Sequence, residues 1–267
     1  MRNEIVHDLS FDDYADAEGY SPSQLVCGFK SMLSLNNARY GDKPTPAQLA
    51  GLLRHTLILE LDKFDAEFAS ADFPNRMTKD YKEFVADNEG KHVVLLTEVV
   101  DAMRTVNAVM SDSTAHRLLE ATKHEAALFV EDLGLQCKGR VDGYGNGILL
   151  DLKTTTTVEP QAFGRIFANL HYAARLACYR RWLQLLGETI DAVYVIACEV
   201  KDDYDVVVYH VPEILLENAW QRVDRIMRKI PNCEKMVKWP GVSSGAMLEV
   251  TVPNWAMEET DLVDWSE

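Results

Sequence analysis

Hydrophobic positions recur every three to four residues in several stretches of the chain, which predicts helices on both sides of a central sheet. Helices are expected to begin near Ser21 and Thr45, because each can cap a helix and is followed directly by proline. Thr45 and Gln48 also have the spacing of a capping box. Further helices are predicted over 93–109, 112–121, 162–186 and 213–230, and Gly187 ends the third of these.

Residues with strand character interrupt this helical pattern in the middle of the sequence. Strands are predicted over 126–130, 137–142, 148–154, 192–198 and 206–211. The glycine-rich segment 143–147 is expected to connect two of them as a hairpin. The order of helices and strands predicts an α/β fold in which a mixed central β-sheet is flanked by α-helices.

Length and composition limit the class of protein. The chain has 267 residues, of which 47% are hydrophobic, enough for one large domain or one domain with appended elements. No apolar run reaches the roughly 20 residues of a membrane helix. The N-terminus lacks the apolar segment of a secretory signal, so we expect a soluble, cytoplasmic protein without a membrane partner. The five cysteines are scattered without a C-x-x-C pair, which disfavours zinc and iron–sulfur sites and favours reduced thiols.

The formal net charge of -15 argues against a broad basic surface that coats nucleic acid. It leaves two alternatives, an acidic enzyme with a metal centre and an acidic interaction protein.

Three residues around the predicted hairpin suggest chemistry. Asp151 and Lys153 lie two apart on one strand and therefore share a face, while Asp142 ends the neighbouring strand. Adjacent carboxylates repel each other unless a cation lies between them, and such oxygen ligands suit Mg²⁺ or Mn²⁺. The alternative is structural: Asp142–Gly143 is also a common hairpin dipeptide, and Asp151 and Lys153 would then form the exposed face of a strand.

Several segments, in order, resemble the exonuclease VIII (RecE-type) branch and related phage members of the PD-(D/E)xK nuclease superfamily. The resemblance covers about residues 5–257. It rests on Tyr20-Ser-Pro-Ser-Gln-Leu25, Gly51-Leu-Leu-Arg-His55 with Leu57 to Glu60, Glu125, Lys138-Gly-Arg-Val-Asp142, Asp151-Leu-Lys153-Thr-Thr, Lys238-Trp-Pro-Gly241 and Val252-Pro-Asn-Trp-Ala256.

This resemblance implies a restriction-endonuclease-like core in a single domain over 1–257 with a helical N-terminal part, followed by an acidic tail over 258–267. It also implies roles for individual residues. A divalent metal would be bound by His55, Glu125, Asp142, Asp151 and the carbonyl group of Leu152. The catalytic residues would be Asp142, Asp151, Lys153 and Glu125.

The implied activity is Mg²⁺- or Mn²⁺-dependent exonuclease digestion of linear double-stranded DNA, 5′→3′, in recombination or phage DNA processing. A single-strand annealing protein is the implied partner, a homo-oligomer the implied assembly, and the host cytoplasm the location if a phage encodes the chain. Two alternatives remain open: a catalytically silent DNA- or protein-binding member of the fold, and an endonuclease on the same scaffold.

Contacts with DNA are expected from Lys138, Arg140, Arg165, Arg175 and Tyr179. Relatives usually have a Q-x-x-x-Y pattern on the helix after the core motif, whereas this chain has Arg175 and Tyr179 at those positions. The spacing still places both side chains on one helix face, and we expect Arg175 to bind a phosphate. Each residue also has a structural alternative, because arginines of this helix commonly form a solvated face and a single histidine such as His55 is commonly a surface or core residue.

Overall fold

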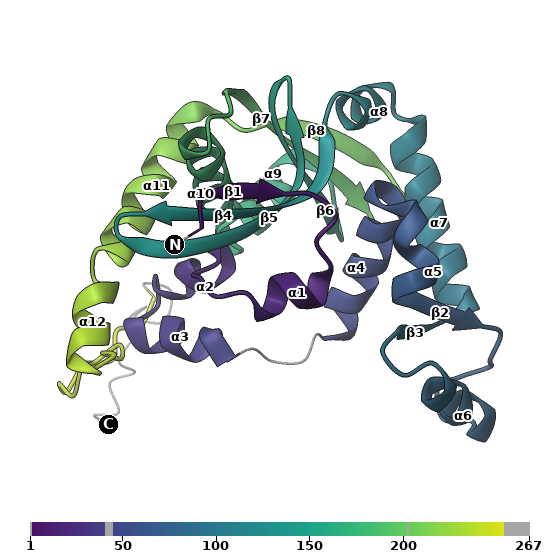
Figure 1. Ribbon diagram of the computed structural model, residues 1–267, viewed down its shortest axis with the longest axis horizontal. Coiled ribbons are helices and arrows are strands. Elements are labelled where there is room, and N and C mark those ends of the chain that lie inside the picture. Colours follow the sequence, from purple (N-terminus) through teal and green to yellow (C-terminus); the bar gives the residue numbers. More distant parts are fainter. Residues whose placement is uncertain (1, 41–44, 202, 254–267) are drawn as a thin grey trace, which may run out of the picture.

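A six-stranded mixed β-sheet runs through the centre of the molecule (Figure 1). The computed structural model describes residues 2–40, 45–201 and 203–253. In spatial order the strands are β1 (Glu4–Val6), β4 (Lys123–Asp132), β5 (Leu135–Gly145), β6 (Gly147–Thr155), β7 (Ile190–Glu199) and β8 (Val206–His210). Only β6 and β7 pair in parallel within this described sheet, and the crossover between them consists of helices α9 and α10.

Helices occupy both sides of this sheet. They are α1 (Phe11–Asp16), α2 (Pro22–Cys27), α3 (Met32–Asn37), α4 (Pro46–Leu59), α5 (Phe64–Glu67), α6 (Lys79–Asp87), α7 (Leu96–Ser111), α8 (Ser113–Glu120), α9 (Pro160–Asn169), α10 (Tyr172–Leu185), α11 (Glu213–Met227) and α12 (Ile230–Met236), with short 3₁₀ turns at Ala38–Tyr40 and Leu61–Lys63. None of the helices in this described part is both long and apolar enough to cross a membrane.

Alternation along β6 and β7 divides the core between the two faces of the sheet. Leu149 and Val195 belong to the cluster that contains the buried residues of α2, α10 and α11. Leu150, Leu152 and Ile196 belong to the cluster on the other face, with buried residues of α7 and α8. Because side chains two apart share a face, Asp151 and Lys153 lie on the α10 side.

A small arm lies beyond α4 and α7, away from the six-stranded sheet (Figure 1). It contains a two-stranded parallel sheet of β2 (Phe68–Ala71) and β3 (His92–Leu95), and α6 lies next to this small sheet. Its own core joins Leu53 of α4, Phe68 and Val94 to Ala102 of α7. The arm therefore fixes α4 against α7, away from the main core.

The predicted mixed sheet flanked by helices is confirmed, and so are the five predicted strands. The hairpin expected over 143–147 is shorter than predicted. Gly143, Tyr144 and Gly145 are part of β5 and pair with β6, so that the turn is centred on Asn146, which has a φ of 50°. The predicted acidic tail over 258–267 and residues 254–256 of the last motif lie outside the described residues.

Two predicted helices were wrong in part. The helix expected over 93–109 begins only at Leu96, because the β-branched pair Val93–Val94 joins the parallel ladder with β2. The single helix expected over 162–186 is two helices, broken at His171, whose φ of 56° is left-handed. No glycine or proline marks this break, which lies directly before the buried stripe of α10.

A glycine on β5 allows α10 to pack close to the sheet. A Cβ atom at Gly139 would lie 2.9 Å from Cε1 of Tyr179 and 3.2 Å from Cζ3 of Trp182, and Trp182 is fully buried. We predict that Gly139→Ala lowers the free energy of unfolding by about 1–3 kcal/mol through overpacking. Denaturant titration would measure the change.

The control is Gly164→Ala in α9, where an added Cβ has no neighbour within 4 Å among the described residues. This substitution should raise stability by roughly 0.5–1 kcal/mol, because alanine is the better helix former. Equal stability of the two variants would contradict the close packing inferred at Gly139.

Candidate active site

Strand register brings Glu125 and Asp142 together. His124 pairs with Gly143 and Ala126 with Val141, so Glu125 and Asp142 lie opposite each other on β4 and β5. Directly opposed residues of antiparallel strands have Cβ atoms roughly 4.5–5.5 Å apart. Glu125 has a left-handed backbone with φ of 50°, and the regular pairing is interrupted at this point. The sheet therefore holds two carboxylates side by side.

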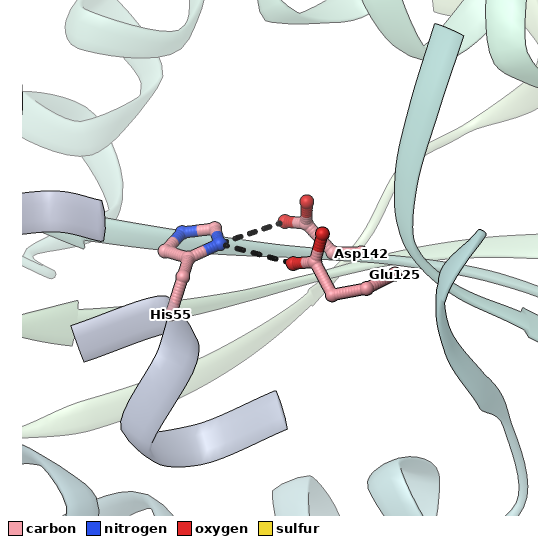
Figure 2. Close-up of side chains that lie close together, drawn as sticks. All are labelled: His55, Glu125 and Asp142. Atoms are coloured by element: carbon pink, nitrogen blue, oxygen red, sulfur yellow. Dashed lines mark ion pairs between the residues drawn. The ribbon is translucent and has the colours of Figure 1, made fainter. Parts of the chain in front are cut away.

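Helix α4 adds His55 to these two carboxylates (Figure 2). Nδ1 of His55 lies 3.8 Å from Oδ2 of Asp142 and 3.9 Å from Oε1 of Glu125. The neighbouring Arg54 is buried and anchors α4 to α7 through Asp101 and Thr105, at 2.5 and 3.2 Å. The anchored helix thus presents His55 to the sheet.

Strand β6 contributes Asp151 and Lys153 to the same place. Nζ of Lys153 lies 2.6 Å from Oδ2 of Asp151 and 3.9 Å from Oδ2 of Asp142. Asp142 also accepts a hydrogen bond of 2.7 Å from the amide of Leu152. The structure therefore brings together all five side chains that the sequence singled out for the metal and the catalytic roles. The Leu152 carbonyl group accepts a hydrogen bond from Nζ of Lys153 at 3.2 Å.

The arrangement fits a divalent cation. One ligand atom each of His55, Glu125 and Asp142 lies within 4.8 Å of the other two, close to the spacing of about 4.2 Å between ligands on opposite sides of Mg²⁺. Oδ2 of Asp151 is buried and has no hydrogen-bond partner in the described residues, because its close contact with Lys153 lacks hydrogen-bond geometry. Carboxylate oxygens of this kind suit a hard divalent cation.

Burial and neighbouring charges shift the pKa values of these groups in opposite directions. Burial raises the pKa of Asp142 to about 6, although His55 and Lys153 act against this shift. Burial also disfavours the charged forms of His55 and Lys153, but the surrounding carboxylates outweigh it and raise the pKa of both residues. The pKa of Glu125 is lowered, since His55 and Arg140 together outweigh its burial. Asp142 of the metal-free site therefore holds a proton below about pH 6, which a cation would have to displace.

Arg140 holds the second oxygen of Glu125. Its Nε lies 2.5 Å from Oε2 of Glu125, and its Nη2 lies 2.8 Å from Oε2 of Glu60. All three side chains are at most 12% exposed. Arg140 was expected to contact DNA, but its guanidinium instead joins two buried carboxylates and orients Glu125 toward His55 and Asp142.

The other residues expected at the DNA differ in their surroundings. Lys138 is buried, and its Nζ donates to the carbonyl groups of Tyr14, Ala15 and Ala17, which uses its three donors. Lys138 thus has internal partners instead of the exposure that a phosphate contact requires. Tyr179 packs against Gly139 and the Trp182 ring and is partly buried, so its expected DNA contact stays a prediction. Arg165 is exposed on α9, and Arg175 is half-buried beside Tyr172.

Two residues of the site were missed by the sequence reasoning. Glu60 closes the predicted glycine–histidine segment, but nothing in the pattern indicated a partner 80 residues away. Tyr172 was not singled out, whereas Nζ of Lys153 lies 5.3 Å from the centre of its ring. Tyr172 also lines a cleft of about 540 Å³ with Gly51 and Thr154, next to the catalytic candidates.

A comparison with protein families identifies the chain's relatives. The model of a family described as a PDDEXK-like domain of unknown function (DUF3799) matches residues 21–249. The chain belongs to this family. Together with the mixed sheet, membership confirms the predicted restriction-endonuclease-like fold, and it supports a nuclease.

One solved structure agrees with the fold of the PDDEXK-like domain. A crystal structure of a candidate exonuclease from Eubacterium rectale is similar over 96% of this chain and 100% of its own, at 16% identity and a TM-score of 0.63. A phage-related exonuclease from Haemophilus somnus 129PT matches over 83% of this chain and 97% of its own, at 13% identity, but its TM-score of 0.36 is too low to show a shared fold. No protein with a curated description matches the sequence.

The raised pKa of Asp142 predicts how metal binding depends on pH. A carboxyl group with a folded-state pKa of about 6 is protonated at lower pH, and its charge destabilises the metal-free domain as the pH rises through that value. A cation needs the deprotonated group. Saturating Mn²⁺, about 100 times Kd, should therefore add about 2.7 kcal/mol near pH 7.5 and much less near pH 5.

Differential scanning calorimetry with and without Mn²⁺ at both pH values would measure this difference. Asp142→Asn should remove most of the metal-induced increase in Tm at either pH. An increase in Tm that does not change between the two pH values would contradict the assignment of Asp142 to the metal.

The bridge from Glu60 through Arg140 to Glu125 predicts an effect on metal affinity without direct contact. We expect Arg140→Gln to weaken Mn²⁺ binding roughly 10–100-fold, the usual effect of losing a group that orients a metal ligand. Arg140→Lys should weaken it less, because it keeps the charge but loses the fork that spans both carboxylates. Isothermal titration calorimetry would measure both; wild-type affinity in Arg140→Gln would contradict the positioning role.

Proposed function

We propose that the PDDEXK-like domain is a Mg²⁺- or Mn²⁺-dependent deoxyribonuclease that hydrolyses phosphodiester bonds. The observation that supports this most directly is the convergence of Glu125, Asp142, Asp151 and Lys153 from three adjacent strands, with His55 from α4. Family membership supports the same class of reaction.

Each part of the site has a place in this chemistry. A bound divalent cation lowers the pKa of a coordinated water and neutralises charge that builds on the phosphate. His55, Glu125, Asp142 and Asp151 would hold it. Lys153 remains protonated between Asp151 and Asp142, so its ammonium can orient the attacking water or offset negative charge near the phosphate.

Linear double-stranded DNA, digested from its 5′ ends, is the proposed substrate, because the sequence resembles exonuclease VIII-type enzymes. The structural neighbour from Eubacterium rectale is named as a candidate exonuclease, which accords with this substrate. The same proposal places the protein in the cytoplasm, as a homo-oligomer that works with a single-strand annealing protein. Its role would be in recombination or phage DNA processing. An endonuclease is the alternative, and cleavage of circular DNA would distinguish it from an exonuclease.

One observation favours a second candidate, a catalytically silent DNA-binding protein. Arg175 occupies the place where relatives usually have glutamine, and it lies beside Tyr172, the ring next to Lys153. Such a protein would bind DNA and leave it intact.

We expect the purified protein to degrade end-labelled linear DNA in Mg²⁺ or Mn²⁺, but to leave covalently closed circles intact. Lys153→Ala should lower kcat roughly 10²–10³-fold, because it removes a preorganised cation from the reacting centre. Asp151→Asn should abolish most activity, since it removes a metal-binding charge without changing shape. Gel analysis of timed reactions would measure both.

The control is Lys79→Ala on the exposed α6, which should cleave like the wild type. Binding without cleavage by the wild type would favour the silent protein, and nicking of circles would favour the endonuclease. Equal rates for the wild type and Lys153→Ala would exclude the proposed role of the lysine.

A further inference from the structure

Several cations near the site have no carboxylate partner. Arg175 of α10, Arg222 and Arg225 of α11, and Lys229 after the end of α11 form no ion pair with any residue that the structure describes. Neighbouring arginines are paired, such as Arg180 with Glu213 and Arg228 with Asp224.

Arg175 lies next to the catalytic candidates. Its Cζ is 5.8 Å from the centre of the Tyr172 ring, and Nζ of Lys153 is 5.3 Å from the same centre. Its Nε is buried and has no hydrogen-bond partner among the described residues. A buried N–H without an acceptor is unfavourable, so this guanidinium is suited to receive an acceptor from a ligand.

Arg222 approaches the same region from α11. Its Cζ lies 4.2 Å from the centre of the Phe29 ring, and Phe29 packs edge-on against His171 at 5.1 Å. His171 directly precedes Tyr172, the first residue of α10. The contact through Phe29 therefore places Arg222 near His171, and the contact with Tyr172 places Arg175 at the next residue of the chain. Both cations thus lie at the start of α10 without an ion-pair partner in the described part of the chain.

The start of α10 adds hydrogen-bond donors that also favour an anion. The amides of Tyr172 and Ala173 have no acceptor among the described residues, and His171 does not cap the helix with its side chain. Free amides and the helix dipole favour an anion at this end.

Further cations follow along the chain. Arg225 is exposed and lies three residues after Arg222, so the two share one side of α11. Lys229 is also exposed and lies in the turn between α11 and α12. Ile226 lies four residues after Arg222 on the same side of α11, and its side chain packs close to Gly28 at the end of α2.

We propose that Arg175, Arg222, Arg225 and Lys229 form a cationic track that binds successive backbone phosphates of a DNA strand next to the catalytic centre. The choice of DNA as the ligand rests on the proposed function. Phosphate is the ligand that suits guanidinium groups without carboxylate partners, and backbone contacts of this kind position DNA without regard to its sequence.

The test compares Arg222→Gln/Arg225→Gln with Lys79→Gln/Lys82→Gln on α6, which removes the same charge far from the track. Binding of fluorescent duplex DNA is measured in Ca²⁺ at several salt concentrations. The slope of log K against log salt should fall by about 0.9 for each phosphate that the track variant no longer binds, and remain unchanged in the control. Mn²⁺ affinity, measured by calorimetry, should equal that of the wild type in both.

Equal slopes for the track variant and the control would overturn the proposal, and so would a matching loss of Mn²⁺ affinity, which would show that the substitution disturbs the metal site. The binding assay does not depend on turnover. A wild type that binds DNA with the steeper slope but cleaves none would therefore support the track while excluding the nuclease.

Discussion

The mutual repulsion of buried carboxylates is the constraint around which the site is arranged. Register alone places Glu125 opposite Asp142, and β6 brings Asp151 beside them. Negative charges at this spacing in a desolvated position are unfavourable unless cations or protons compensate them. Three basic side chains surround the group: His55 on one side, Lys153 on another, and Arg140 behind Glu125. Burial nevertheless raises the pKa of Asp142, so these side chains do not fully offset its loss of hydration, and a metal ion could do so.

The basic residues near the site have different roles, and burial distinguishes those with internal partners from those that are available to a ligand. Arg140 and Lys138 have all their close partners inside the protein: carboxylates for the first, helix-end carbonyl groups for the second. Arg175, Arg222, Arg225 and Lys229 have no carboxylate partner among the described residues. An acidic protein can therefore present a local cationic surface, because its excess of carboxylates is placed elsewhere or already paired.

The replacement of glutamine by Arg175 acquires a physical interpretation in this arrangement. Glutamine offers a neutral amide, whereas arginine brings a permanent charge and a fork of donors to the same helix face. Beside Tyr172, that charge lies next to the ammonium of Lys153. In the proposed nuclease, Arg175 would therefore change how the DNA strand near the reacting phosphate is held.

Local patterns determined much of the molecule from sequence alone. The caps at Ser21 and Thr45, the five strands and the pairing of Asp151 with Lys153 on one face all follow from short-range spacing. The set of metal and catalytic candidates came from a resemblance of motifs. Only the tertiary structure decided which cations are buried, because burial depends on contacts between residues distant in the chain, as between Glu60 and Arg140. It also decided the helix break at His171 and the strand at Val93–Val94, since packing against other elements outweighed local helix propensity there.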